Sequence, residues 1–304
     1  MVGLGNMGSG MAKNLFRSGF PVCMFDVAAS RAQELQQSLQ LEAGSSPPDH
    51  DRVRGATVAD SPAQVMQSSN VVLVCVYNET QGKEVILGDS GLLLAGREAT
   101  AGSVVVDLGT VSPGYSKQMA EEVARAGAGY LDAPVSGGPQ GANEGKLLCT
   151  PPCTACTCTG TLSIMVGGEQ ELFSHCLPVL EAIGTHIVHM GGAAAGTAAK
   201  LVNQQHLVIC NTAAACEAYV LARRLGLRDS PKLLDLLSRS WGNSLMLEKT
   251  FQDMAKAEAA GDIAALSESR APVRTLLKDG GIIAQAAAEA RLDLPVFPAG
   301  NAQV

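Results

Sequence analysis

The stretch that decides the fold is Gly3-Leu4-Gly5-Asn6-Met7-Gly8, a G-x-G-x-x-G element near the start of the 304-residue chain. A helical pattern follows it over residues 9–18, and a strand pattern over 21–26 then ends at Asp26. Glycines at these positions let the backbone approach a pyrophosphate, which binds at the N-terminus of the helix. An acidic residue roughly 20 residues further on is placed to accept hydrogen bonds from the adenosine ribose. The spacing therefore predicts a dinucleotide site.

The type of dinucleotide depends on Asp26. A carboxylate at this position repels the 2′-phosphate of NADP, so the sequence favours NAD as the cofactor. The alternative is a glycine-rich turn in an unrelated fold, and the acidic residue in register argues against it. Met1 and Val2 alone precede Gly3, so the strand expected before the loop is almost missing. We expect from this that the N-terminus is truncated.

Outward from this element, the first half of the chain alternates short β-branched runs with helical patterns. Strand patterns lie at 71–76, 104–107, 130–133 and 161–166, and helical patterns at 30–41 and 117–126. After residue 193 the strand signal nearly vanishes, and helices are predicted over 193–225, 230–238 and 275–291. Alternation of this kind is typical of a parallel sheet with helices on both faces. The predicted fold is α/β, with a Rossmann-type doubly wound domain over 1–190 that binds NAD. A long helix joins it to an all-helical domain over 191–304 for substrate binding and dimerisation.

Charge and composition exclude several classes of function. The chain carries 22 Lys+Arg against 29 Asp+Glu, a net charge of −7, which argues against a nucleic-acid surface or an anionic membrane surface. No apolar run reaches the roughly 18 residues of a membrane helix, and no secretory signal pattern opens the chain. The nine cysteines do not require an oxidising compartment. We therefore expect a soluble intracellular protein of the cytoplasm or mitochondrial matrix, with no visible targeting segment.

A second glycine-rich segment, Ser136-Gly137-Gly138, follows the short strand that ends near Ala133. Its backbone N–H groups and the Ser136 hydroxyl could form a cradle for a carboxylate. An ordinary strand-to-loop turn explains the same residues equally well.

Three polar residues interrupt the apolar pattern of the long predicted helix. Lys200, Asn203 and Gln204 are three and four residues apart, so they share one face of that helix. A lysine on an alanine-rich helix is usually an exposed residue whose ammonium group reaches into solvent. The polar neighbours at this spacing, close to the predicted domain junction, favour a functional site instead.

Taken together, six segments resemble the β-hydroxyacid dehydrogenase family. They are GLGNMGSGMAKNL, VVVDLGTVSP, DAPVSGGPQGA, LSIMVGG, GTAAKLVNQ and LLKDGGI, which start at residues 3, 104, 132, 162, 196 and 276. The resemblance implies that Lys200 is the catalytic acid/base and that Asn203 orients the substrate. It also implies which other residues contact the substrate and the cofactor. Ser136, Gly137 and Gly138 would help bind the substrate carboxylate, and the cofactor residues would include Val76, Tyr77, Thr110 and Lys278.

The resemblance implies oxidation of a small hydroxy acid by hydride transfer to NAD. The lysine takes the hydroxyl proton, a role that requires a pKa lowered toward neutrality. The leading substrate is 3-hydroxyisobutyrate, which would give methylmalonate semialdehyde. No metal is required, and the five histidines form no ligand pattern; His186-x-x-His189 is interpreted as strand-end packing.

Two departures from the family pattern keep alternatives open. Gly109 stands where the family usually has Ser, and Gln204 where the 3-hydroxyisobutyrate-oxidising members have Asn. Gln204 and the segment 240–244 resemble the threonate-oxidising branch instead. Reduction of glyoxylate or succinic semialdehyde is a further alternative, although such relatives prefer NADP and Asp26 opposes it. A catalytically dead binding module is the non-enzyme alternative, and Lys200 argues against it. The expected partners are a small hydroxy acid and further copies of the chain in a dimer or tetramer, with no nucleic acid and no membrane.

One segment fits neither domain. Residues 146–160, KLLCTPPCTACTCTG, contain four of the cysteines, which could form a zinc site. Deleting this segment joins GANEG to TLSIMVGG and restores the family pattern without a gap. We interpret it as a spurious insert, a retained intron in the gene model, that forms a disordered loop because Pro151 and Pro152 exclude a helix or a central strand.

Overall fold

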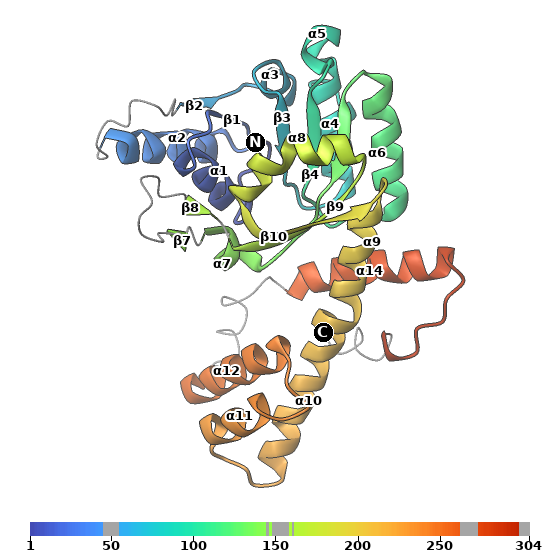
Figure 1. Cartoon of the computed structure of the whole chain (residues 1–304). Coiled ribbons are helices and arrows are strands. Elements are labelled where there is room, and N and C mark those ends of the chain that lie inside the picture. Colours follow the sequence, from blue (N-terminus) through green and yellow to red (C-terminus); the bar gives the residue numbers. More distant parts are fainter. Residues whose placement is uncertain (45–54, 144–145, 148–157, 160, 262–272, 298–304) are drawn as a thin grey trace. The chain divides into compact units, whose positions relative to one another are not determined.

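The computed structural model describes residues 1–44, 55–143, 146–147, 158–159, 161–261 and 273–297 (Figure 1). The chain divides into two compact units, Met1–Lys200 and Leu201–Val304, which are called unit 1 and unit 2.

Unit 1 contains the described strands and the helices around them. The strands are β1 (Val22–Met24), β2 (Ala56–Val58), β3 (Val71–Val74), β4 (Val104–Asp107), β5 (Gly129–Asp132), β6 (Val135–Ser136), β7 (Lys146–Leu147), β8 (Cys158–Thr159), β9 (Leu162–Gly167) and β10 (Gly184–Gly191). The helices are α1 (Gly8–Arg17), α2 (Ala29–Gly44), α3 (Pro62–Gln67), α4 (Glu79–Leu87), η1 (Leu92–Ala95), α5 (Arg97–Thr100), α6 (Pro113–Arg125), α7 (Gly138–Asn143), α8 (Gln170–Glu181) and α9 (Ala195–Val202, whose last two residues belong to unit 2).

The main sheet has the order β10-β9-β5-β4-β3, with β6 paired to β9. Val2 extends it, because this residue bridges both Val74 and Phe25 and so joins the sheet to β1 and β2. The backbone at Val2 thus lies between β3 and Phe25, which follows β1, and the strand expected before the glycine loop is present only as these isolated bridges. The sequence predicts a parallel sheet, and β3, β4 and β5 are parallel, but β9 runs antiparallel to β5.

Both faces of the sheet are covered, as the near-continuous apolar strands predict. Val104 and Val106 of β4 belong to an apolar cluster with residues of α1, α2 and α8, whereas Val105 faces a second cluster with residues of α3, α4 and α6. Strand side chains alternate between faces, so each strand contributes to both clusters. In Figure 1 the helices of this unit accordingly flank the sheet.

Of the segment 146–160, which we interpret as an insert, only the two ends are described. Lys146 and Leu147 pair antiparallel with Thr159 and Cys158, so these four residues form a short ladder rather than the predicted disordered loop. The backbone pairing brings the two ends of the segment together. Residues 148–157 and 160 lie outside the described residues, and three of the four cysteines of the zinc alternative, Cys149, Cys153 and Cys156, are among them.

Unit 2 is helical in its described residues. After α9 the chain continues as a π-helix, η2 (Asn203–Cys210), and then as α10 (Asn211–Arg224), followed by α11 (Ser230–Ser238), α12 (Leu245–Ala260) and α14 (Val273–Glu289). The long helix predicted over 193–225 is thus present, with a π-helical middle. Two apolar clusters hold the unit: Tyr219 of α10 packs with Phe251 of α12, and Ile209 of η2 packs with Ile283 of α14. Among the described residues, no helix has the length and hydropathy to cross a bilayer.

Candidate functional site

The loop from Gly3 to Gly8 has the backbone that a pyrophosphate site needs. Gly3 has a φ of +86°, and a Cβ there would collide with the Cys75 carbonyl oxygen; a Cβ on Gly8 would collide with that of Gly3. A Cβ on Gly5 would meet nothing within 4 Å. No side chain caps the N-terminus of α1, and no acidic residue lies in its first turn. The open side of the loop therefore fits a phosphate group.

Asp26 lies at the carboxyl end of β1, next to this loop, and is buried. Its Oδ2 accepts a hydrogen bond from the Leu4 N–H at 2.7 Å, and its Oδ1 accepts one from the Ala28 N–H at 2.9 Å. A carboxylate offers about four acceptor positions, so capacity remains for a ribose hydroxyl. Arg31 adds a charge that the sequence analysis did not consider, since its Nη1 lies 3.6 Å from Asp26 Oδ1.

Val76, Tyr77 and Thr110 lie in the loops that follow β3 and β4, which are neighbouring strands. Glu79 holds these two loops together, because its Oε1 accepts a hydrogen bond from the Ser112 N–H at 2.7 Å. Tyr77 is 43% exposed, whereas Val76 and Thr110 are half-buried. The two loops thus present all three residues at one edge of the sheet.

The second glycine-rich segment joins β6 to α7, because Ser136 ends the strand and Gly138 begins the helix. Gly137 and Gly138 have φ values of +139° and +64°, which L side chains rarely adopt. Helix α7 packs against α1, where Asn14 Nδ2 donates a hydrogen bond to the Ala142 carbonyl oxygen at 2.9 Å. This contact fixes the position of the segment Ser136 to Gly138 relative to the dinucleotide loop.

Asp132, at the carboxyl end of β5, holds the N-terminus of α9. Its Oδ1 accepts a hydrogen bond from the Ala194 N–H at 2.8 Å, and its Oδ2 accepts one from the Thr197 N–H at 2.7 Å. The Thr197 hydroxyl also bonds with that of Ser116 at 2.9 Å. A carboxylate at a helix N-terminus satisfies N–H groups that lack partners within the helix. The position of α9 is therefore set from the sheet.

Lys200 lies one turn beyond Thr197 on α9 and is 5% exposed. The interpretation as an exposed lysine reaching into solvent is therefore wrong for this structure. Burying the charged side chain of a lysine costs free energy unless a partner compensates the charge. A buried lysine is therefore more typical of a functional residue than of a surface residue.

Two buried carboxyl groups are paired across β4 and β5, where Asp107 is the register partner of Asp132. Burial raises the pKa of Asp107 to about 6, and burial also raises the pKa of Asp132. Asp107 accepts a hydrogen bond from the Gly109 N–H at 2.9 Å and one from the Tyr130 hydroxyl at 3.3 Å. Neither residue was predicted from the sequence to have a role. Their position at the last residue of a strand is the signal that could have found them.

Unit 2 contains a cluster of polar side chains of its own. Gln204 is buried, and its Nε2 donates a hydrogen bond to Asp279 Oδ2 at 2.7 Å. Lys278 Nζ lies 3.0 Å from Asp279 Oδ1. Asn203 Nδ2 is 3.4 Å from Gln204 Oε1, a long hydrogen bond. The structure thus links Gln204 and Lys278 to Asp279, and Asn203 to Gln204. Gln204, the departure from the family pattern, contacts Asp279 directly.

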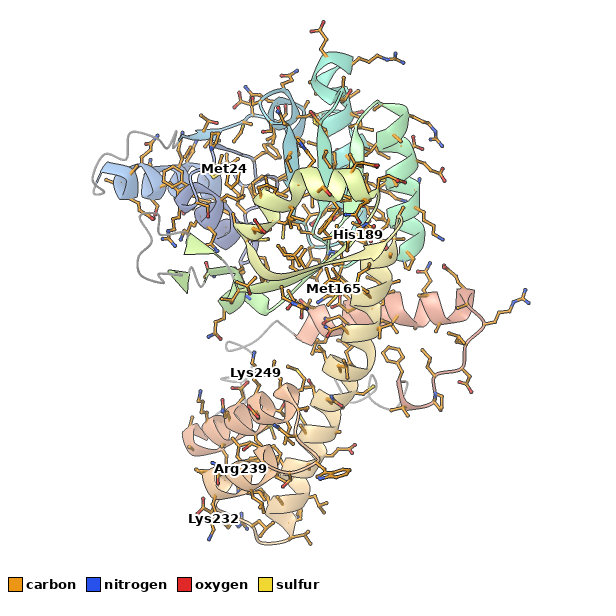
Figure 2. All side chains as sticks on the ribbon, viewed as in Figure 1. Met24, Met165, His189, Lys232, Arg239 and Lys249 are labelled. Atoms are coloured by element: carbon orange, nitrogen blue, oxygen red, sulfur yellow. The ribbon has the colours of Figure 1, made fainter. Side chains whose placement is uncertain are left out.

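His189, labelled in Figure 2, has the packing role that the sequence suggested. Its Nε2 lies 2.8 Å from the Gly168 carbonyl oxygen, and its ring centroid is 5.1 Å from that of Phe173. His186 is exposed. Within the described part of the chain, no group of three or more His, Cys, Asp or Glu side chains could hold a metal ion.

Two family models match nearly the whole chain. The NAD binding domain of 6-phosphogluconate dehydrogenase matches residues 1–157 and 153–192. The NAD-binding domain of NADP-dependent 3-hydroxyisobutyrate dehydrogenase matches residues 194–303.

Relatives of known function are about one third identical. 2-(Hydroxymethyl)glutarate dehydrogenase of Eubacterium barkeri is 32% identical over 97% of this chain and 84% of its own length. L-threonate dehydrogenase of Cupriavidus necator is 32% identical over 99% of this chain and 87% of its own length. Mitochondrial 3-hydroxyisobutyrate dehydrogenase of Mus musculus is 33% identical over 77% of this chain, and the match spans 58% of the mouse protein.

Solved structures agree on the fold. The crystal structure of 3-hydroxyisobutyrate dehydrogenase from Salmonella typhimurium superposes with a TM-score of 0.76 at 24% identity, covering 99% of this chain and 90% of that chain. The dinucleotide-binding models, together with the open glycine loop and the buried Asp26, make a nicotinamide dinucleotide the cofactor of this fold. The chain belongs to the β-hydroxyacid dehydrogenase family, whose members named above are dehydrogenases of hydroxy acids.

Proposed function

We propose that this chain oxidises the hydroxyl group of a small hydroxy acid, with Lys200 as the acid/base and a nicotinamide dinucleotide as the hydride acceptor. The observation that carries the proposal is the burial of Lys200 on a helix that Asp132 holds by two hydrogen bonds. A buried amine in a fixed position is suited to proton transfer, which needs a donor and an acceptor within hydrogen-bond reach.

The proposed roles follow from the residue chemistry. During oxidation the neutral amine of Lys200 accepts the proton of the substrate hydroxyl, and in the reverse direction the ammonium group returns it. The N–H groups of Gly137 and Gly138 and the hydroxyl of Ser136 bind the substrate carboxylate, and Asn203 orients the substrate. The bound dinucleotide supplies the acceptor for the hydride. Gly3 to Gly8 hold its pyrophosphate, while Val76, Tyr77, Thr110 and Lys278 contact its other parts.

The test is reduction of NAD by the purified full chain in the presence of candidate acids, followed by the absorbance of the reduced nicotinamide. We expect turnover with at least one small hydroxy acid. If the protein binds NAD but reduces none with any acid in the panel, the proposed reaction fails and the chain is a binding module.

For the substrate we propose 3-hydroxyisobutyrate, oxidised to methylmalonate semialdehyde. Support comes from the mouse relative and from the domain description of the C-terminal match. Threonate is the second candidate, because the relative from Cupriavidus necator matches 99% of this chain. Comparing kcat/KM for the two acids decides between them. A value for threonate more than tenfold higher would make threonate the substrate.

For the cofactor we propose a preference for NAD that Asp26 sets and Arg31 limits. The Asp26 carboxylate repels a 2′-phosphate, but the Arg31 guanidinium, 58% exposed, can bond to one. Asp26→Ala should raise the use of NADP, and Arg31→Ala should lower it. If the unmodified protein turns over NADP better than NAD, the assignment of Asp26 is wrong.

We propose that the segment 146–160 is a retained intron in the gene model. The match of the N-terminal family model in two pieces, 1–157 and 153–192, supports an interruption in this region. We expect deletion of residues 146–160 to preserve or raise both stability and activity. Loss of folding on deletion, or loss of activity together with bound zinc, would make the segment a structural site. Transcript reads that span it uniformly would also reject the intron.

We also propose that the chain works as a homo-oligomer in the cytoplasm or the mitochondrial matrix. The names of the mouse and human relatives, which are mitochondrial, support the second compartment. Imaging of the tagged full-length protein in its own cells distinguishes the two.

A further inference from the structure

The polar cluster of unit 2 lies at the contact between η2 and α14. Ile209 of η2 and Ile283 of α14 belong to one apolar cluster, and the same two elements carry Gln204 and Asp279, which are 8% and 1% exposed. A buried polar group costs free energy unless it is hydrogen-bonded. Few arrangements of these side chains therefore satisfy every donor and acceptor.

Asp279 faces a donor at each of its two carboxylate oxygens. Gln204 Nε2 donates a hydrogen bond to Oδ2 at 2.7 Å, and the ammonium group of Lys278 lies 3.0 Å from Oδ1. An ionised carboxylate accepts at both oxygens, whereas an amide of the same shape offers one oxygen and one NH₂ group. An asparagine at this position could therefore serve only one of the two donors.

The carboxylate determines which way the Gln204 amide points. Because an ionised carboxylate only accepts hydrogen bonds, Gln204 turns its NH₂ group toward Asp279 and its carbonyl oxygen away. That oxygen, Oε1, is the atom that lies 3.4 Å from Asn203 Nδ2. Asn203 thus turns its own NH₂ group toward Gln204, which directs its carbonyl oxygen, Oδ1, to the other side.

The backbone at Asn203 also departs from the regular helix. Asn203 is the first residue of the π-helix η2, directly after α9, which carries Lys200. π-helical turns are rare and occur frequently at functional sites. The residue that the proposed reaction uses to orient the substrate therefore lies where the helix changes, and its side chain contacts the group that Asp279 holds.

We propose that Asp279 is a positioning residue: through Gln204 it fixes the amide of Asn203 so that Oδ1 accepts a hydrogen bond from a hydroxyl group of the substrate. This inference rests on the proposed function, in which Asn203 orients a small hydroxy acid. It also gives a role to Gln204, the residue that departs from the family pattern.

The kinetic test exchanges the donor and the acceptor. In Asp279→Asn the amide oxygen stays with the charged Lys278, so the new NH₂ group faces Gln204, and the amides of Gln204 and Asn203 turn over. We expect kcat/KM for the acid that is oxidised fastest in the panel to fall about tenfold, the scale of one lost hydrogen bond. The dissociation constant for NAD should change little.

The double variant Gln204→Glu with Asp279→Asn restores the original orientation. Its carboxylate, now at position 204, accepts one hydrogen bond from the new NH₂ group and one from Asn203. We expect kcat/KM to return to within about threefold of the original, which a purely structural loss at position 279 would not allow. Gln204→Met, which has similar length and no amide, should lower kcat/KM as Asp279→Asn does.

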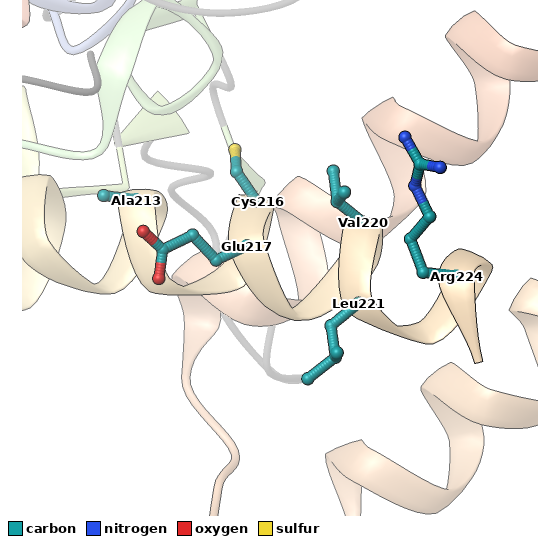
Figure 3. A pocket seen from close by; sticks show the side chains of 6 residues that line it. All are labelled: Ala213, Cys216, Glu217, Val220, Leu221 and Arg224. Carbon is teal, nitrogen blue, oxygen red and sulfur yellow. The ribbon is translucent and has the colours of Figure 1, made fainter.

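Nuclear magnetic resonance tests the orientation of Asn203 without turnover. The side-chain NH₂ signals of Asn203, identified by their loss in Asn203→Asp, should shift in Asp279→Asn and return in the double variant. Glu217→Gln is the matched control, because it changes an exposed carboxylate on the continuing helix, in the shallow hollow of α10 drawn in Figure 3. This position is roughly 20 Å along the helix from Gln204, so neither the signals nor kcat/KM should change.

Thermal unfolding checks that each variant folds, and Gln204→Met takes the place of Asp279→Asn if the latter does not. Unchanged Asn203 signals in the single variant would overturn the proposal. So would shifted signals with a normal kcat/KM, or a double variant as slow as the single one. If the unmodified protein oxidises no acid in the panel, the proposed function fails, and the Asn203 signals alone then decide whether Asp279 sets the orientation.

Discussion

Three carboxylates of unit 1 and two of unit 2 have different kinds of hydrogen-bond donors. In unit 1, Asp26 accepts a bond from the backbone N–H of Leu4, Glu79 from that of Ser112, and Asp132 from those of Ala194 and Thr197. In unit 2, Asp279 accepts a bond from the side chain of Gln204, and Glu258 accepts bonds from the side chains of Arg223 and Tyr219.

This difference determines what a substitution changes. A carboxylate that accepts bonds from the backbone fixes a loop or a helix end, so its removal moves the main chain. A carboxylate in a side-chain network orients other side chains and leaves the main chain in place. Substitution of a carboxylate such as Asp132 should therefore alter the geometry of the proposed reaction more than substitution of one such as Glu258.

The largest effect is expected for substitution of Lys200, which lies on the helix α9 that Asp132 holds in place. Lys200→Ala should lower kcat by roughly 10²-fold or more, the scale of general acid–base catalysis, while the dinucleotide still binds. Steady-state kinetics and a binding titration measure both quantities. The control is Lys117→Ala, an exposed lysine on α6, which should leave kcat unchanged. Near-normal kcat in the Lys200 variant would remove this residue from the chemistry.

The second-largest effect is expected for substitution of Asp132, the carboxylate that accepts hydrogen bonds from the backbone of α9. Asp132→Asn keeps one acceptor oxygen but turns an NH₂ group toward the second N–H of α9, so the helix must shift. We expect kcat to fall about tenfold, since misplacement by about 1 Å can cost up to ~10²-fold in rate. The KM for the dinucleotide should change less than kcat.

Asp107→Asn is the matched control, because Asp107 is the register partner of Asp132 and is equally buried. One of its two donors is the Tyr130 hydroxyl, which can rotate and accept a bond from the new NH₂ group. We expect kcat within about twofold of normal. Equal losses in the two variants would mean that buried charge, rather than the position of α9, accounts for the effect.

A smaller effect is expected at the open side of the glycine loop. Gly5→Ala adds a methyl group where the folded chain has free space, so the unfolding free energy should change little. The same methyl group would occupy the proposed phosphate position, and the dissociation constant for NAD should rise on the order of tenfold, about 1.4 kcal/mol. Gly114→Ala, at an exposed position with equal space, should leave NAD binding unchanged. Normal NAD binding by the Gly5 variant would move the pyrophosphate elsewhere.

The smallest effect is a pH dependence of stability in unit 1. The folded pKa of Asp107, about 6, lies above its ordinary value near 3.8, so the folded chain binds more protons than the unfolded chain between these values. Stability should therefore fall as the pH rises from about 4 to about 6. Urea unfolding at both ends of this range should show a smaller fall for Asp107→Asn than for the unmodified protein. Asp89→Asn, an exposed carboxyl, should retain the fall, and an identical fall in the Asp107 variant would refute this assignment.

Local chemistry explains what the sequence predicted correctly. The glycine loop, the strands β3 and β4 and the long helix from α9 to α10 each have a signal within a few residues, either a glycine spacing or an apolar period. Helix α12 was missed although the Ser244 hydroxyl caps it by accepting a hydrogen bond from the Leu247 N–H at 3.0 Å, and Gly261 ends it in the left-handed region. These two caps are a sequence signal that a search for helix ends could have used.

By itself, the sequence determined the family, the dinucleotide loop and the identity of Lys200 as the residue of interest. Tertiary structure alone decided that Lys200 is buried and that Asp132 holds its helix, because that carboxylate bonds to N–H groups 62 and 65 positions away along the chain. It also decided that β9 runs antiparallel to β5, and that Gln204 is bonded to Asp279, 75 positions away along the chain. Periodicity and motif spacing report contacts between near neighbours in sequence, whereas burial and long-range hydrogen bonds depend on where distant segments meet.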